Sequence, residues 1–162
     1  MSEQEATAFL ALERTVTCAT VGVRGWPHLM PLWYVVREGA DGQSSPSGPR
    51  VWAWTYAASQ KVRNLERDPR ATLQIEAGES YQELRGVMLE CEAQIRREPA
   101  IVAALGNEIF RRYAVPRGQQ PVADLSGEVA AMVEKQAAKR VALEFVEQRR
   151  TSWDHRKLGG LY

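Results

Sequence analysis

Six stretches of the chain have the pattern of hydrophobic and polar positions that is typical of β-strands. The clearest is residues 85–97, in which every second residue from Val87 to Ile95 is apolar and the residues between them are mainly polar. A period of two residues places one face of a strand against a core. The other predicted strands are residues 15–21, 27–36, 51–56, 70–76 and 140–146.

Helical patterns are fewer and lie between or beside these strands. Residues 5–13 form a short amphipathic pattern, and a second short helix begins at Ser59 and has to end at Pro69. Two more helices are predicted over about 99–138, one from Pro99 to about residue 113 and one over about 125–138. Residues 38–49 are rich in Gly, Ser and Pro and predict a long mobile loop. The tail, residues 150–162, has no useful periodicity.

Strands joined by hairpin turns predict a closed antiparallel barrel of six strands in one domain, residues 1–162. A doubly wound parallel sheet is disfavoured, because helices do not alternate with strands and no Gly-x-Gly-x-x-Gly is present. Both faces of the strand 27–36 are mostly apolar, so both are expected to be covered. Pro31 cannot donate a hydrogen bond to a neighbouring strand, which places it at an edge or a bulge.

The composition narrows the class of protein. The 162 residues are 44% hydrophobic and carry a net charge of +1, which argues against nucleic acid as the main partner. No leader-like segment and no stretch of about 20 apolar residues is present, and Cys18 and Cys91 fall at apolar-facing strand positions. We therefore expect a soluble, cytoplasmic protein with reduced core cysteines. The two histidines lie far apart, so we expect no metal site.

The helix that begins at Ser59 carries the strongest chemical signal. Lys61 and Asn64 are three residues apart and share a face near its N-terminus, whereas Val62 and Leu65 form its inward stripe. Several groups that favour an anion converge there: free N–H groups, the positive end of the helix dipole, a hydroxyl, an ammonium and an amide. Together they suit a phosphate. The alternative is a serine N-cap followed by ordinary solvated side chains.

Four segments, in this order, resemble the pyridoxamine 5'-phosphate oxidase-like, or flavin reductase-like, split-barrel proteins. They are Ala19-Thr-Val with Gly25-Trp-Pro-His28, Pro31-Leu-Trp33, Ser59-x-Lys61-x-x-Asn64-Leu65 followed by Arg67-Asp-Pro-Arg70, and Glu83-Leu-Arg-Gly-Val87. The resemblance covers residues 14–95, with a weaker one over 139–158. Within the family, the chain is most similar to short enzymes assigned to the deazaflavin coenzyme F-420. The Arg-rich terminus of a true pyridoxamine 5'-phosphate oxidase is missing.

The resemblance implies a six-stranded, Greek-key split β-barrel that forms a homodimer and binds FMN or coenzyme F-420 in grooves between the subunits. The implied activity is hydride transfer between reduced coenzyme F-420 and a small unsaturated substrate. An FMN-dependent oxidoreductase or FMN-binding protein of the same fold is the alternative. A protein that sequesters haem or another cofactor without turnover ranks third, and haem would need His28 or His155 as an axial ligand.

The resemblance also implies roles for individual residues. Ser59, Lys61 and Asn64 would hold the cofactor phosphate, and Val62 lies among them. The cofactor ring would be lined by Pro31, Leu32, Trp33, Trp54 and Thr55. Trp33 and Trp54 fit a hydrophobic core equally well, and Trp52, which shares a face with Trp54, is expected in the core. His28 is a candidate proton donor, or a histidine that merely satisfies a backbone partner.

The tail concentrates one large aromatic residue and three potential cations: Trp153, His155, Arg156 and Lys157. This composition suits an anionic, aromatic ligand. We expect Trp153 and His155 to cross to the partner subunit or to cover the cofactor groove. The alternative is a frayed terminus that contributes almost nothing.

Overall fold

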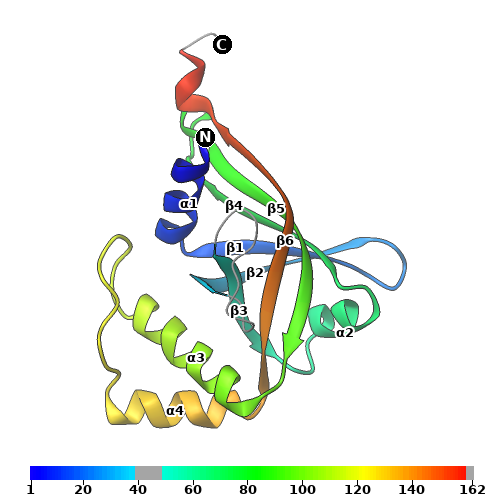
Figure 1. The fold of residues 1–162 in the computed structure, drawn as a ribbon, viewed down its shortest axis with the longest axis vertical. Coiled ribbons are helices and arrows are strands. Elements are labelled where there is room, and N and C mark those ends of the chain that lie inside the picture. Colours follow the sequence, from blue (N-terminus) through cyan, green and yellow to red (C-terminus); the bar gives the residue numbers. More distant parts are fainter. Residues whose placement is uncertain (39–48, 160–162) are drawn as a thin grey trace.

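Six antiparallel strands form a closed barrel in the computed structural model, which describes residues 1–38 and 49–159 (Figure 1). The strands follow one another around the barrel in the order β1-β2-β3-β6-β5-β4. Their bounds are β1 (Thr15–Val21), β2 (Pro27–Arg37), β3 (Arg50–Tyr56), β4 (Arg70–Ala77), β5 (Arg85–Arg96) and β6 (Arg140–Asp154). The predicted fold class is confirmed.

The helices cover the barrel from outside and close its ends. They are α1 (Glu3–Leu12), α2 (Gln60–Arg67), α3 (Pro99–Tyr113) and α4 (Gly127–Ala137), with the short 3-10 turns η1 (Tyr81–Glu83) and η2 (His155–Leu158). In Figure 1, α3 and α4 lie at the bottom left, α2 at the right, and the two ends of the chain at the top. The predicted loop over 38–49 falls almost entirely outside the described residues.

Two hydrophobic cores lie on opposite faces of the same sheet. The barrel interior is filled by alternate strand residues, together with residues of α1 and α2, among them Phe9, Val16, Val62, Leu65, Leu73, Leu89 and Phe145. The second core lies between the outer face of the sheet and the helices α3 and α4, and contains Val35, Trp52, Trp54, Leu105, Ile109 and Val133. Two cores explain why the sequences of β2 and β3 are apolar on both faces.

The barrel is split between β2 and β3. These strands pair only from Tyr34 opposite Ala53 to Arg37 opposite Arg50. Residues 27–33 of β2 therefore pair only with β1, and residues 54–56 of β3 only with β6. Pro31 lies on the open edge of β2, which confirms the expectation from its missing N–H group. Helix α2 follows directly from the open end of β3.

The last strand is longer than the sequence pattern predicted. Strand β6 runs to Asp154 rather than to about residue 146, because every residue of β5, from Arg85 to Arg96, pairs with it. A bulge opposite Glu90 and Cys91 leaves Gln148 without a partner in the register. Next to it, Glu147 and Arg150 form an ion pair with both side chains largely buried. The bulge and this pair interrupt the alternation that would have revealed the strand.

Candidate functional site

The N-terminus of α2 lies at the split of the barrel. Ser59 precedes the helix in the extended conformation, with φ −73° and ψ 154°, as an N-cap residue does. Its hydroxyl makes no capping hydrogen bond, and Ser59 Oγ is buried without a partner in the described part of the chain. The first N–H groups of a helix have no partner within it. A buried hydroxyl and free amides are therefore available at one place.

Lys61 brings a cation to this place. Its side chain is only 6% exposed, and Nζ donates a hydrogen bond of 3.0 Å to Thr55 Oγ1 on β3. Among residues 1–38 and 49–159 it has no ion-pair partner. Burial lowers the pKa of Lys61, the charge of Arg140 lowers it further, and the interaction with Cys18 acts in the opposite direction. A buried ammonium that faces only a neutral hydroxyl is costly, and an anion would offset that cost.

Asn64 serves the helix rather than an open site. It is fully buried, and Nδ2 donates to Thr20 Oγ1 on β1 at 3.0 Å. Its Oδ1 accepts from Gln60 Nε2 at 2.9 Å. Both ends of the amide are thus bound by the protein, which attaches α2 to β1. Val62 lies in the barrel core and faces away from the free groups of Ser59. Thr20 was missed in the sequence, because nothing local links it to Asn64.

The three predicted ring residues on β2 do not share a face. Leu32 points into the barrel core, so Pro31 and Trp33 point outward, where both are exposed. The Trp33 ring stacks on Tyr113 at the end of α3, with centroids 4.4 Å apart. His28 is half-buried, and its Nδ1 is buried without a partner within the described ranges. Pro31 and Trp33 therefore present an apolar surface along the open edge of β2.

Trp54 belongs to the outer core. It is buried against α3, with its ring edge-on to Phe110 at 6.2 Å and Arg140 Cζ 4.3 Å from the ring centroid. Gly106 lets α3 lie close to β3, since a Cβ at this position would come within 2.9 Å of the Trp54 ring. The structure thus brings Thr55, Ser59 and Lys61 together and does not bring Trp54 to them. Alternation along β3 gives Thr55 and Trp54 opposite faces.

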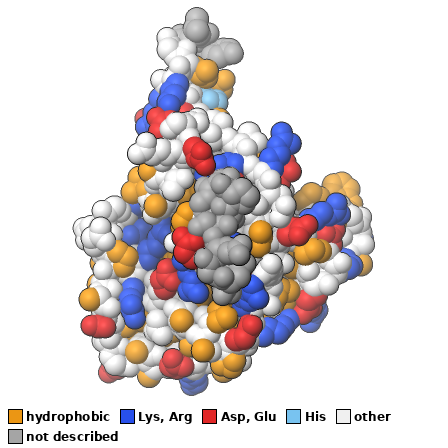
Figure 2. Space-filling view, in the orientation of Figure 1, with side chains coloured by type: hydrophobic (Ala, Val, Ile, Leu, Met, Phe, Trp, Pro, Cys, Tyr) orange, Lys and Arg blue, Asp and Glu red, His pale blue; other side chains and the backbone are white. Residues whose placement is uncertain are grey.

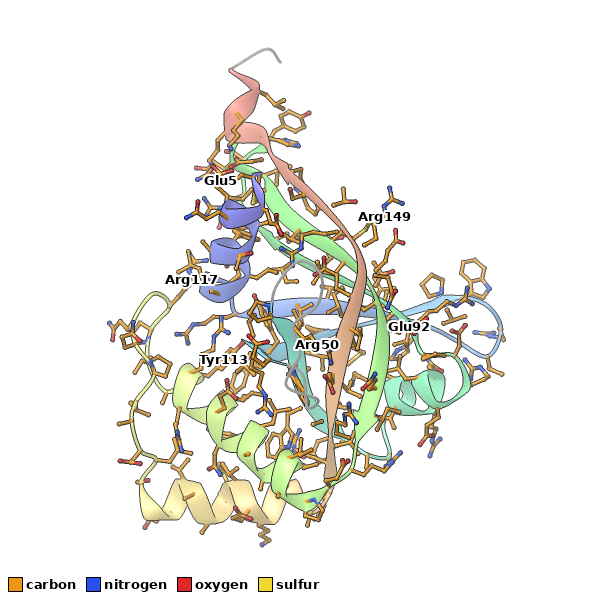
Figure 3. All side chains as sticks on the ribbon, viewed as in Figure 1. Glu5, Arg50, Glu92, Tyr113, Arg117 and Arg149 are labelled. Atoms are coloured by element: carbon orange, nitrogen blue, oxygen red, sulfur yellow. The ribbon has the colours of Figure 1, made fainter. Side chains whose placement is uncertain are left out.

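The tail lies at the other end of the molecule from α2 (Figure 1). Trp153 is part of β6 and covers Gly86 on β5. His155 Nδ1 lies 2.9 Å from the Tyr81 carbonyl oxygen, and Lys157 pairs at 2.6 Å with Glu5 of α1. Figure 3 shows Glu5 near this end of the molecule. Residues 150–159 of the tail are therefore packed on their own chain rather than frayed. Within one subunit it does not approach Lys61.

Three further observations concern clustered metal ligands, the cysteines and the length of the helices. No group of three or more His, Cys, Asp or Glu residues in residues 1–38 and 49–159 could hold a metal ion. Cys18 and Cys91 are both free and buried, and burial raises the pKa of the Cys18 thiol to about 12. In the same ranges no helix is long and apolar enough to cross a membrane.

Comparisons with known proteins agree with this fold. The sequence model of the family described as pyridoxamine 5'-phosphate oxidase matches residues 2–135. A conserved hypothetical protein, Rv2991 from Mycobacterium tuberculosis, is 39% identical with a TM-score of 0.79, and the match covers 100% of this chain and 90% of that one. A comparison with curated proteins finds no match.

Two further solved structures show a likeness of fold alone. An F420 reductase is 18% identical with a TM-score of 0.60, over 89% of this chain and 94% of that one. HutZ, a haem storage protein from Vibrio cholerae, is 15% identical with a TM-score of 0.62, over 94% of this chain and 93% of that one.

Proposed function

The chain belongs to the pyridoxamine 5'-phosphate oxidase family, and from this premise we propose that it is an oxidoreductase that uses coenzyme F-420 or FMN. When bound, such a cofactor supplies hydride transfer to a small unsaturated substrate, whereas the protein binds, orients and excludes water.

The observation that carries this proposal is the uncompensated cation at α2. Lys61 is buried beside the neutral Thr55 hydroxyl, and Ser59 Oγ is buried without a partner. Both lie at the first turn of a helix, where the dipole and free N–H groups favour an anion. A cofactor phosphate would satisfy all of these groups at once. Asn64, bound to Thr20, holds the helix in place for it.

The remaining roles follow from the split of the barrel. The open edge of β2 would carry the cofactor ring, with Pro31 and Trp33 as its apolar contacts. His28 is the candidate proton donor, since its buried Nδ1 has no partner among the described residues. Trp153 and His155 are too far from α2 to serve the same subunit, so we assign them to the cofactor groove of the partner in a homodimer.

Titration with cofactors tests the proposal. The purified protein should bind coenzyme F-420 or FMN, each of which has its own visible absorbance, and Lys61→Ala should weaken that binding. A charge-assisted hydrogen bond to phosphate contributes about 1.5–3 kcal/mol, so the dissociation constant should rise roughly 10- to 150-fold. Lys135→Ala on the exposed face of α4 is the matched control and should bind normally. An unchanged dissociation constant for Lys61→Ala would refute the phosphate site.

Haem binding without turnover is a second candidate, and it rests on His155. The contact of Nδ1 with the Tyr81 carbonyl oxygen, 2.9 Å away, directs Nε2 outward, as a ligating histidine requires. A Soret band on addition of haemin, lost in His155→Ala, would support this candidate. Flavin or deazaflavin binding that depends on Lys61, without a Soret band, would exclude it.

A further inference from the structure

A cavity lies on the side of the molecule away from α2. Its volume is about 700 Å³, and it is lined by α1, the end of β2, α3 and the connector between α3 and α4, residues 114–126. Figure 3 shows Tyr113, at the end of α3, and Arg117, on the connector, on this side. Small-molecule sites have volumes of about 300–1,000 Å³, so the cavity is large enough for a ligand.

The connector is fixed in place over the cavity. Arg14 Nη2 donates to the Pro116 carbonyl oxygen at 2.8 Å, and Arg117 pairs with the buried Glu13 at 2.8 Å. On the other side, the Val122 N–H donates to the Arg111 carbonyl oxygen at 3.3 Å. The cavity is therefore built by contacts on both sides rather than left by a loose loop. Its apolar lining comes from Ala8, Ala11, Leu12, Val35, Val36, Pro121, Val122 and Ala123.

Three arginines line this cavity without a counter-charge. Arg112 donates only to main-chain carbonyls, those of Ala11, Glu13 and Tyr34, and Arg14 likewise donates only to that of Pro116. Arg111 is exposed at the rim. In the part of the chain that the structure describes, none of the three guanidinium groups forms an ion pair.

The single acidic residue of the lining does not compensate these charges. Glu108 pairs with Arg37 outside the cavity at 3.2 Å. The cavity thus combines an apolar floor with an excess of positive charge. Tyr113 supports this arrangement, because its ring lies 5.2 Å from Arg14 Cζ and 5.9 Å from Arg112 Cζ. Guanidinium groups bind carboxylates strongly, because the planar fork matches both oxygens.

We propose that this cavity binds a small organic anion with an apolar body, of which a medium-chain carboxylate is the type. The carboxylate pairs with Arg111 at the rim, in the positive field of Arg14 and Arg112. The apolar body packs against α1 and β2. The site is separate from the phosphate site at α2, so it does not depend on a flavin or deazaflavin being the cofactor.

Calorimetric titration of the full-length protein tests the site, with decanoate as the probe and decanol as its neutral analogue. Decanoate should bind at least 10-fold more tightly than decanol. Arg111→Gln should weaken decanoate binding about 10-fold, and Arg111→Lys should restore part of it. Ala123→Trp, which fills the cavity from an exposed lining position, should abolish binding. Arg24→Gln, on the exposed β1–β2 turn, is the matched control and should bind as the wild type does.

The outcomes separate the parts of the proposal. Equal binding of decanoate and decanol, or an Arg111→Gln variant that behaves like Arg24→Gln, would overturn the anion site. Decanoate binding that survives Ala123→Trp would overturn the assignment to this cavity. Loss of decanoate binding in Lys61→Ala would place the anion at α2 instead. Circular dichroism of each variant confirms that the fold is retained.

Discussion

At the scale of single residues, Lys61 is the position where stability and function conflict. Its ammonium is buried and hydrogen-bonded to a neutral hydroxyl, with no carboxylate partner in the described ranges. Such an arrangement destabilises the protein without ligand and becomes favourable when an anion is bound. The neighbouring Ser59 and Asn64 show the two different uses of polar groups here. Ser59 has a buried hydroxyl oxygen without a partner in the described ranges, whereas the Asn64 amide is fully hydrogen-bonded within the fold.

Lys61→Met should therefore stabilise the cofactor-free protein and weaken phosphate binding as Lys61→Ala does. We expect the free energy of unfolding to rise by about 0.5–2 kcal/mol, because an uncompensated buried charge is replaced by an apolar chain of similar length. Thermal and urea unfolding of both proteins measure the difference. A less stable variant would show that the ammonium already has a favourable environment without ligand.

The advantage of Lys61→Met should depend on pH. Burial lowers the pKa of Lys61 from its ordinary value of 10.5, so the unfolded chain binds more protons than the native protein between the two pKa values. Wild-type stability then rises with pH in that interval. The difference between variant and wild type should be largest below the native pKa and should close as the pH approaches 10.5. Urea unfolding from pH 7 to 10.5 measures it, and a gap that widens with pH would contradict the assignment.

At the scale of elements, the pairing of β5 with β6 decides where the barrel ends. The four residues 151–154 pair with residues 88–85 of β5, and Trp153 occupies the space above Gly86. A Cβ at Gly86 would overlap the Trp153 ring and come within 2.7 Å of the Ile75 carbonyl oxygen. Beyond Asp154, the tail is attached mainly by exposed polar contacts, among them that of Lys157 with Glu5.

Two shortened chains should separate the strand from the tail. A chain that ends at Arg150 loses the last four residues of β6 and should be destabilised by about 2 kcal/mol or more, because Trp153 and four strand positions are removed. A chain that ends at Asp154 loses exposed contacts and should unfold within a few degrees of the full chain. Thermal unfolding compares them. Equal melting temperatures for the two would mean that residues 151–154 add nothing to the barrel.

At the scale of the whole molecule, the split leaves a large apolar surface uncovered. Trp26 is 74% exposed, Leu29 57% and Trp33 51%, and all three lie on or beside the open half of β2. Figure 2 shows hydrophobic side chains at the projecting hairpin on the right of the view. Exposed large apolar side chains gathered along one strand edge are typical of an interaction site. A second copy of the chain is the partner that we propose, which would also bring the tail of one subunit towards the α2 site of the other.

Leu29→Glu should therefore convert a dimer into a monomer. An obligate interface buries more than roughly 2,000 Å², and a carboxylate at its centre would have no partner. Sedimentation velocity at micromolar concentration measures the state of both proteins. Met132→Glu, on the exposed side of α4, is the control and should leave the dimer intact. A wild-type monomer that binds cofactor would remove the basis for a site between subunits.

The sequence by itself determined the strands of the barrel and the place at which we propose a phosphate site. Alternation is a local property, so it identified β1 to β5, and Ser59, as an N-cap residue, identified the start of α2. The edge position of Pro31 followed from its missing N–H group alone. These features need only neighbours in the chain, which is why they could be predicted.

Only the tertiary structure decided which faces and which distant residues meet. Trp54 and Thr55 are adjacent in sequence, yet one lies under α3 and the other holds Lys61, because the sheet has a core on each side. Asn64 turned out to bind Thr20, which lies 44 residues away in the sequence. Pairing with β5 set the length of β6. The packing of α1, α3 and the connector formed the cavity and placed its three arginines. Contacts between residues so far apart in the chain leave no periodic trace in the sequence, and they exist only once the barrel has closed.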